Sequence, residues 1–593
     1  MIHFSYLPKN KILVVSFNKA EEYILPQDLL AECDKIIYEI GEKKDLKQVI
    51  FVGEKDFWHK SIRINSFLSL YECMSWAKKW REFLKKIKEL NCPTYAYIQG
   101  NCESIGLELA LTCRYRIAHR ETTFTCQDVR YGHLPVGGSL FRLISLIGIN
   151  ETLQILLLGS TLTSEKAYKI GLTHFLTSWP FDNRDIILPI FKSKSYHFFI
   201  EDLPWVRGYL FRKWRQQILN RFRGHFRAPL KLLEVLERGW FKGGETRGQL
   251  EMEAFSELVF SSQAHTLEYV HSRLRSLYDV GPSVLKVGLI RGDEDFCGEL
   301  AIFFSKKASM SVNALNKSKL QSLGRIISSA KTVIELNCTQ VNDAAYDFIL
   351  EKKNDPGFLY ECLMVKENFK FLVRFFSPFE ERKIVEIYTV DKRSMPFVVF
   401  LLGLGKIPLQ LKATCPIAHS PVIRLSLSLF QEAQLLSFQG ISFEIIQNAW
   451  QDLGMHPKLF EIWRESCTDE FMEFIKKLNE LFPERFWIKP DNEKMIKSPD
   501  LQNVFMVRLL KESLLLLEEN IVSDPFLVDM LLVYGVGFPR YRGGLLRHVD
   551  EDGGIVWFEK MNEMSLTCSE RFAVPQLFKK IIEEKRQIYE RTF

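Results

Sequence analysis

The sequence lacks most of the features that mark special classes of protein. Its apolar runs are all shorter than the roughly 18 residues of a membrane-spanning helix, and no secretory cleavage site follows the first of them. The 12 cysteines include no CxxC pair and no metal-ligand spacing, which argues against a disulfide framework and a metal site. Low-complexity segments and short repeats are also absent. We therefore expect a soluble, cytoplasmic protein with no transmembrane segment and no metal.

The sequence also lacks a dominant charge. Lys and Arg number 79 and Asp and Glu 73, which leaves a formal net charge of +6 over 593 residues. So weak a balance gives no reason to expect nucleic-acid binding, although a local basic groove for an anionic cofactor remains open. Apolar residues at 47% and charged residues at 26% exclude a largely disordered chain. The length corresponds to roughly two to four domains.

Short apolar runs alternate with amphipathic stretches in the first third of the chain. Ile12–Phe17, Gln48–Val52 and Thr94–Ile98 are rich in β-branched and aromatic residues and predict buried strands, the first of them opening the chain. A helix that includes Gly106 is expected directly after the third run. A strand, a glycine-containing turn and a helix start in this order point backbone N–H groups at a ligand.

The rest of the chain changes character three times. Residues 195–223 are basic and aromatic and are interpreted as a connecting region, and residues 227–280 carry apolar residues at helical spacing. A strand at Lys286–Ile290 opens a second α/β region that runs to about residue 411. From about residue 412 the pattern is helical to the C-terminus.

Three stretches in the first third carry a resemblance to a known family. They are residues 93–118 (PTYAYIQGNCESIGLELALTCRYRIA), 124–143 (FTCQDVRYGHLPVGGSLFRL) and 159–172 (GSTLTSEKAYKIGL). In order and spacing they resemble the signature of the crotonase, or enoyl-CoA hydratase, superfamily.

Two stretches in the second half extend the resemblance. Residues 374–387 (RFFSPFEERKIVEI) resemble the active-site segment of 3-hydroxyacyl-CoA dehydrogenases, and residues 535–550 (GVGFPRYRGGLLRHVD) resemble the C-terminal helical domain of multifunctional β-oxidation α-subunits. The resemblance covers nearly the whole chain and implies an α/β multidomain protein. Its domains would be a crotonase (ββα spiral) domain at 1–190, a helical linker region at 191–280, a Rossmann-like NAD-binding-type domain at 281–411, and all-α dehydrogenase C-terminal domains at 412–593.

The resemblance implies a hydratase centre in the first domain. Hydration of a conjugated thioester needs two carboxyl groups around a water and an oxyanion hole. The carboxyl groups fall on Glu108 and on Asp128, which is shorter by about 1.5 Å than the family's glutamate, and a misplacement of about 1 Å can cost on the order of 100-fold in rate. The oxyanion-hole donors fall on Ser61 and Ile105. Ser104 and Ile105 replace family glycines, which narrows the approach to the thioester.

A dehydrogenase centre is implied in the second half, with changes that disfavour it. Hydride transfer needs a base for the hydroxyl proton, an acid to orient that base, and NAD. Glu386 matches the family's glutamate, but Arg374 replaces the histidine and cannot act as a base, so we expect an Arg374–Glu386 ion pair. Thr339 retains a hydroxyl where the family has serine, and Ser420 replaces an asparagine of the substrate pocket.

NAD is the cofactor implied by the resemblance, but its binding loop is degraded. The loop spans residues 291–298 and retains only Gly292 and Gly298 of the expected glycines, with three acids where a diphosphate would approach. Ala314 stands at the position of the ribose-binding acid. Like-charge repulsion and the lost ribose contact both oppose NAD binding.

Three hypotheses therefore remain open. The chain is a β-oxidation α-subunit with both activities, or an enzyme in which only the hydratase or isomerase half works, or a non-catalytic scaffold that binds acyl-CoA or docks a thiolase β-subunit. The combined changes favour the second and third hypotheses.

Phenylalanine is unusually frequent, at 46 residues. Because Phe375, Phe376 and Phe538 match core positions of the family, we interpret this excess mostly as packing.

Overall fold

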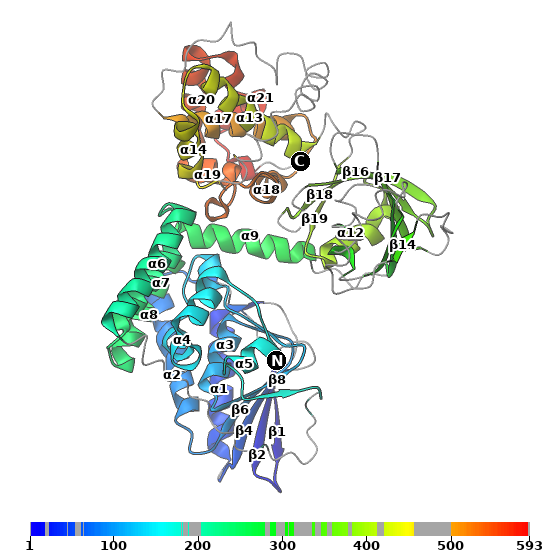
Figure 1. Cartoon of the computed structure of the whole chain (residues 1–593). Coiled ribbons are helices and arrows are strands. Elements are labelled where there is room, and N and C mark those ends of the chain that lie inside the picture. Colours follow the sequence, from blue (N-terminus) through cyan, green and yellow to red (C-terminus); the bar gives the residue numbers. More distant parts are fainter. Residues whose placement is uncertain are drawn as a thin grey trace. The chain divides into compact units, whose positions relative to one another are not determined.

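The computed structural model describes most of the chain in two compact units, Met1–His271 and Ser272–Phe593 (Figure 1). The division falls within helix α9 (Ser262–Tyr278). The four domain boundaries expected from the resemblance remain predictions. The described residues are 2–17, 23–43, 45–53, 61–62, 64–179, 181, 188, 203–278, 285–291, 300, 303–305, 308–313, 335–337, 346–352, 358–376, 382–411, 420–455, 460 and 500–590.

The first unit is built on a six-stranded sheet in the order β1-β2-β4-β6-β8-β11. Its strands are β1 (Ile2–Leu7), β2 (Ile12–Phe17), β4 (Gln48–Gly53), β6 (Thr94–Ile98), β8 (Tyr115–His119) and β11 (Phe175–Thr177). All neighbours pair in parallel except β1 and β2. The three predicted strands are confirmed. The expectation that Ile12–Phe17 opens the chain was wrong, because β1 precedes it. The residues of β1 are mostly half-buried and polar at two of six positions, so it shows no continuous apolar run.

Helices accompany this sheet, and small sheets lie beside it. The predicted helix is α3, and the connecting region expected at residues 195–223 contains the helix α6 in the part that the structure describes. An N-terminal proline gives α6 its start. The helices are α1 (Pro26–Glu42), α2 (Leu70–Lys88), α3 (Ser104–Thr112), α4 (Ser139–Leu158), α5 (Ser164–Lys169), α6 (Pro204–Phe222), α7 (Arg227–Gly239) and α8 (Gly244–Val259). The small sheets are β10 (Leu162–Thr163), β9 (Thr123–Thr125) and β7 (Asn101–Glu103), and β3 (Tyr23–Ile24) with β5 (Ser61–Ile62).

Helix α4 is apolar and long enough to pass as a membrane span over Ser139–Leu157, and most of that stretch is buried inside the protein. Gly148 breaks it, with φ 78° and ψ 169°, so the segment is two helices across a kink. Such dihedral angles are almost confined to glycine. Its burial and its kink are those of a core helix pair.

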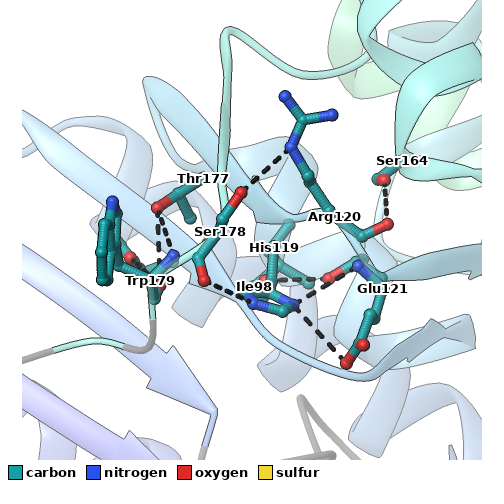
Figure 2. Close-up of polar contacts among 10 residues, drawn as sticks. Ile98, His119, Arg120, Glu121, Ser164, Thr177, Ser178 and Trp179 are labelled. Carbon is teal, nitrogen blue, oxygen red and sulfur yellow. Dashed lines mark hydrogen bonds and ion pairs between the residues drawn. The ribbon is translucent and has the colours of Figure 1, made fainter.

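Backbone and side-chain contacts join the carboxyl ends of β8 and β11 (Figure 2). The Arg120 backbone N–H donates to the Thr177 carbonyl at 2.9 Å, and Arg120 Nε donates to the Ser178 hydroxyl at 3.0 Å. His119 Nε2 lies 3.3 Å from the Ser178 carbonyl oxygen, and the Ser164 hydroxyl donates to the Arg120 carbonyl. These contacts hold the edge strand β11 against β8, which gives this group of polar side chains a structural role.

The second unit contains an eight-stranded mixed sheet in the order β14-β13-β12-β15-β16-β17-β18-β19. The first four pair in parallel, β15 to β18 pair antiparallel, and β19 is parallel to β18. The strand predicted at Lys286–Ile290 is confirmed as β12. The bounds are β12 (Val287–Arg291), β13 (Ser309–Asn313), β14 (Glu335–Asn337), β15 (Phe348–Lys352), β16 (Phe358–Met364), β17 (Phe369–Phe375), β18 (Ile384–Tyr388) and β19 (Ile407–Gln410).

Phenylalanine rings fill the core against this sheet. Phe304, Phe348, Phe375, Phe397 and Phe400 are each fully buried, and their ring centroids include pairs 5.2 Å apart. Such pairs contribute about 0.5–1.5 kcal/mol beyond their buried area. The interpretation of the phenylalanine excess as packing is confirmed for these residues.

The chain after residue 411 is helical in its described parts, as expected. Besides α12 (Met395–Gly403), which packs against β19, the helices are α13 (Pro421–Phe438), α14 (Phe443–Asp452), α17 (Leu501–Glu518), α18 (Pro525–Met530), α19 (Leu545–Asp552), α20 (Gly554–Thr567) and α21 (Gln576–Glu583). A buried carboxylate, Glu432 on α13, binds the Arg571 guanidinium in bidentate fashion, both contacts at 3.0 Å. Arg508 Nε on α17 lies 3.5 Å from the same carboxylate.

Candidate active site

Glu108 lies in the middle of α3 and is only 2% exposed. Its Oε2 accepts a hydrogen bond from the Trp80 indole at 2.7 Å, and its Oε1 accepts from the Gly137 backbone N–H at 2.6 Å and the Ser139 hydroxyl at 3.2 Å. Burial raises the pKa of this carboxyl, although these donors and the Arg142 guanidinium favour its charged form. Glu108 is therefore not a solvated helix-face acid but a carboxyl held in one orientation.

Glycine at position 137 permits this arrangement. A Cβ at Gly137 would lie 2.8 Å from the carboxyl carbon of Glu108 and 2.6 Å from a methyl carbon of Leu84. Both distances are shorter than any normal carbon contact, so a side chain here would push Glu108 or α2 away. The backbone N–H of Gly137 can approach the carboxylate only because this residue has no side chain.

Asp128 opens the short 3-10 helix η2 (Asp128–Tyr131) and is 5% exposed. Its Oδ2 accepts a hydrogen bond from the Cys126 thiol at 3.0 Å, and its Oδ1 lies 3.7 Å from His133 Nδ1. Burial raises the pKa of Cys126, which keeps this thiol protonated, and burial lowers the pKa of His133, which keeps its imidazole neutral at pH 7. Asp128 thus has weak neutral partners and no cation beside it in these contacts.

The structure brings the two predicted carboxyl groups to one cavity. Glu108, Asp128 and Ile105 line it together with the aromatic side chains of Trp76 and Phe255. Its volume is about 30 Å³. One water needs at least about 10–15 Å³ measured in this way, so the cavity has room for about two waters and not for an acyl chain. Glu268 also lines the cavity, so three carboxyl groups and a volume of this size suit the handling of a water molecule.

The turn predicted to supply an oxyanion-hole donor has a conformation that favours glycine. Ser104 has a φ of 43°, in the left-handed region, which costs about 1–2 kcal/mol for a residue with a side chain. Ile105 follows at the start of α3 and is 5% exposed. The second predicted donor, Ser61, lies in β5 beside Ile62, which also lines the cavity. Ser104 and Ile105 both line the cavity, and the narrowing expected from their side chains stays a prediction.

Several neighbours of the two carboxyl groups were not predicted. Cys126 and His133 contact Asp128, and Gly137 and Ser139 contact Glu108. All four lie within the stretch of residues 124–143 that carries the resemblance, which is the signal that could have pointed to them. Trp80 lies in another helix, and no local pattern connects it with Glu108.

In the second unit Glu386 is completely buried in β18, directly across from Arg374 in β17. The predicted ion pair is confirmed, with Arg374 Nε 3.9 Å from Glu386 Oε2. Glu386 also accepts hydrogen bonds from the Tyr388 hydroxyl at 2.6 Å, the Ser420 hydroxyl at 3.0 Å and the Val422 backbone N–H at 3.2 Å. Burial raises the pKa of Glu386, although each of these partners lowers it. The Glu386 carboxylate therefore has a structural role, because its oxygens are engaged by this ion pair and these hydrogen bonds.

Ser420 has a structural role in this unit. It is the N-cap of α13, where its hydroxyl oxygen accepts from the Ile423 backbone N–H, and it donates to Glu386. Its hydroxyl group is engaged in both of these hydrogen bonds.

Four other predicted residues lie outside the described residues: Thr339, Gly292, Gly298 and Ala314. Within the described residues there is no group of three or more His, Cys, Asp or Glu side chains placed to hold a metal ion.

Comparison with known proteins identifies relatives along the chain. Residues 8–178 match the family model described as enoyl-CoA hydratase/isomerase. The fatty acid oxidation complex subunit alpha of Shewanella loihica is 22% identical, over 94% of this chain and 95% of that protein. The subunit of the same name from Vibrio parahaemolyticus is 24% identical, over 85% of this chain and 86% of that protein.

Solved structures of enoyl-CoA hydratases also match the chain at low similarity. The enzyme from Bacillus halodurans is 17% identical and covers 45% of this chain and 98% of its own, with a TM-score of 0.31. A putative enoyl-CoA hydratase from Streptomyces avermitilis is 17% identical and covers 46% of this chain and 89% of its own, with a TM-score of 0.32.

Proposed function

The chain is a divergent relative of the α-subunits of fatty acid oxidation complexes, and from this premise we propose that it acts in fatty-acid β-oxidation through its first unit. This unit binds an acyl-CoA thioester and adds water to a conjugated enoyl group. The observation that carries the proposal is the burial of Glu108 and Asp128 on one water-sized cavity that Ile105 also lines. The domain that contains them is of the crotonase type.

The two carboxyl groups can divide the proton transfers of hydration between them. Addition of water requires one group to accept a proton from the water while another delivers a proton to the substrate carbon. Burial, and to a lesser extent the charge of Asp128, raise the pKa of Glu108, which makes Glu108 the better placed of the two to deliver a proton. The backbone N–H groups of Ser61 and Ile105 would stabilise negative charge on the thioester oxygen.

The proposed activity is tested by hydration of crotonyl-CoA, followed as the loss of enoyl absorbance. Glu108→Gln keeps the shape of the side chain but cannot exchange a proton, so we expect a loss of about 10²–10⁴-fold in kcat. Glu121→Gln is the matched control, because Glu121 is an exposed glutamate in the same unit. A rate unchanged by Glu108→Gln would remove Glu108 from the proposed role.

A non-catalytic function is the second candidate, and the narrow cavity favours it. In this function the chain would bind acyl-CoA or dock a thiolase β-subunit as a scaffold. Ile105 and the strained Ser104 occupy a turn where a glycine would leave more space, and the cavity of about 30 Å³ is smaller than any thioester. Binding of crotonyl-CoA with no turnover, equal in the protein and in Glu108→Gln, would support the scaffold.

For the second unit we propose a Rossmann-type domain followed by all-α dehydrogenase-type domains, without hydride transfer. The parallel order β14-β13-β12-β15 corresponds to the strand order 3-2-1-4 of dinucleotide-binding folds, which supports the domain type. Arg374 occupies the position of the expected base, is 1% exposed and pairs with Glu386, so the residues there do not fit the reaction. NAD would supply the hydride acceptor if it were bound.

A titration with NADH, followed by its fluorescence, tests the second unit. We expect no binding below millimolar concentration. Binding in the micromolar range would contradict the proposed loss of the cofactor.

The cytoplasm is the proposed location, because β-oxidation of this type works on soluble CoA thioesters.

A further inference from the structure

The first unit has a second, larger hollow, at the end of α3 opposite the Ile105 turn. Its volume is about 600 Å³, and its walls come from the C-terminal parts of α2 and α3, from α4 and α8, and from the beginnings of β6 and β8. Six cationic side chains line it: Arg81, Lys88, Arg114, Arg116, Arg142 and Arg247. Glu108, Asp128 and Ile105 are not part of its wall, so the hollow is separate from the water-sized cavity.

The positive charge of this hollow is mostly unmatched by acids. Among the described residues of its wall the only acid is Glu251, which is fully buried and binds Arg81 Nη1 at 2.7 Å. Burial lowers the pKa of Arg116 to about 10, so this guanidinium is still charged at pH 7. Burial, and then Arg116, lower the pKa of His174 to about 4, so this wall residue is neutral. Glu251, and Glu108 from outside the wall, also attract Arg142, so six cations face two carboxyl groups and the hollow keeps an excess of positive charge.

Hydrogen bonds within the fold orient the guanidinium groups but do not engage all of their N–H donors. Arg116 donates to the Leu172 carbonyl at 2.7 Å and the Cys113 carbonyl at 2.9 Å. Arg142 donates to the Thr112 hydroxyl at 2.6 Å, and Arg247 Nε donates to a carbonyl oxygen of α7 at 2.9 Å. A guanidinium has five N–H donors, so neutral partners of this kind orient it and leave both donors and charge available. Purely structural contacts with carbonyls would not require so many like charges around one hollow.

We propose that this hollow is a binding site for an organic polyphosphate of nucleotide size. Its volume lies within the range of about 300–1,000 Å³ that is usual for small-molecule sites. Arginine binds phosphate oxygens through two parallel N–H groups, and preoriented guanidinium groups lose little freedom on binding. Leu111, Phe141 and Leu146 supply an apolar part of the wall for the organic part of the ligand. This site goes beyond the proposed hydratase, and its ligand does not take part in that reaction.

The test is calorimetric titration of the full-length protein with ATP and, separately, with inorganic tripolyphosphate. We expect ATP to bind with micromolar affinity at low salt and at least tenfold more weakly in about 0.5 M salt, because screening acts on charge pairs near solvent. We also expect ATP to bind at least tenfold more tightly than tripolyphosphate, because of the apolar wall. Asp128→Asn, which should slow the proposed hydration, should bind ATP as the unmodified protein does, because Asp128 is not part of the wall. The outcome therefore does not depend on the proposed hydratase.

Charge reversal at the mouth of the hollow provides the matched comparison. Lys88 and Arg114 are exposed, so Lys88→Glu combined with Arg114→Glu should leave the fold intact, as circular dichroism can verify. We expect this variant to bind ATP at least tenfold more weakly. Lys78 and Lys79 are also exposed, on the same helix α2 as Lys88 but outside the wall. Their double replacement by Glu makes the same change in net charge and should alter the affinity less than twofold.

Three results would overturn the proposal. The first is no binding of either probe below millimolar concentration. The second is an equal loss of affinity in the two charge-reversed variants, which would show only attraction to the whole protein. The third is equal binding of ATP and tripolyphosphate, or binding of an acidic peptide such as polyglutamate in preference to both.

Discussion

Asp128 is the residue at which the hydratase site differs most simply from the resembled family. Its carboxyl group reaches the shared cavity but is shorter than the family's glutamate by one methylene, about 1.5 Å. Its partners, the Cys126 thiol and the neutral His133 imidazole, are weak and leave its oxygens adaptable. The length of the side chain is therefore the difference at this position that a substitution can test.

We expect Asp128→Glu to raise the rate of crotonyl-CoA hydration by up to about 100-fold, because an error of about 1 Å in a catalytic group costs a factor of this size. The measurement is kcat in the absorbance assay. Asp128→Asn serves as the control and should lower the rate. A decrease in Asp128→Glu would mean that the Cys126 and His133 contacts, rather than side-chain length, position this carboxyl group.

Asp529 on α18 predicts a pH dependence of stability. It is completely buried, and burial raises its pKa to about 7, although it accepts hydrogen bonds from the Tyr589 hydroxyl, Leu546 N–H and Arg547 N–H. Between about pH 4 and pH 7 the folded protein then holds a proton that the unfolded chain has lost. The free energy of unfolding should fall as pH rises through this window, by at most about 4 kcal/mol.

Asp529→Asn should remove this contribution. The midpoint of thermal unfolding should fall less between pH 5 and pH 8 in the variant than in the unmodified protein. Glu251, whose pKa burial raises to about 7, adds a similar slope in the first unit, so the comparison should follow the difference between variant and parent. Equal pH profiles for both proteins would contradict the raised pKa of Asp529.

The candidate site shows what a sequence can predict at the scale of residues. Glu108 and Asp128 were found because a motif with fixed spacing contains both, and the Arg374–Glu386 pair because one substitution changed a base into a permanent cation. Trp80 was not assigned, because a contact across helices leaves no spacing in the sequence. Gly137 was not assigned either, although it lies in the stretch that carries the resemblance. Gly137 could be understood only when the carboxylate beside it was located.

Among the elements, helix α4 contains the sharpest local constraint. Gly148 has dihedral angles almost confined to glycine, and it separates two apolar helical segments that both pack into the first unit. We expect Gly148→Ala to lower the free energy of unfolding of this unit by about 1–3 kcal/mol. The measurement is chemical denaturation followed by circular dichroism.

Gly41 in α1 is the matched control. It has ordinary helical dihedral angles, and a Cβ there would have nothing within 4 Å. Gly41→Ala should therefore stabilise the same unit by about 0.5–1 kcal/mol, since alanine is the better helix former. If Gly148→Ala were as stabilising as Gly41→Ala, the kink would not be a requirement of the fold.

Elements with strong apolar runs could be predicted, and weaker ones could not. The buried strands β2, β4 and β6 are apolar along almost their whole length, as expected of parallel strands covered on both faces. Strand β1 is half-buried at an edge, and α6 has a polar and basic surface with few buried residues, so neither has a clear pattern. Tertiary contacts, rather than a local sequence pattern, determine the secondary structure of β1 and α6.

At the scale of the whole molecule, composition indicated ordinary globular domains but not the distribution of charge. The net charge of +6 is small, yet six cations surround one hollow of the first unit. A sum over 593 residues hides such a concentration, because acids elsewhere balance it. The sequence therefore left a local basic groove possible, and only the structure shows where cationic side chains gather.

The two compact units have separate buried networks, which leads to a prediction for the entire chain. In the second unit Glu432 compensates the buried guanidinium groups of Arg571 and Arg508. Glu432→Gln should cost about 3–5 kcal/mol, because it leaves these cations without their carboxylate. Gly148→Ala acts in the first unit only.

Calorimetry of the full-length protein should then show two unfolding transitions, since chains of several domains seldom unfold in one step. Gly148→Ala should lower the temperature of one transition and Glu432→Gln that of the other, and the double variant should combine both shifts without further change. A single transition that moves with either substitution would show that the two units unfold cooperatively. In that case changes in the second unit, including those at Arg374, would act on the stability of the hydratase site as well.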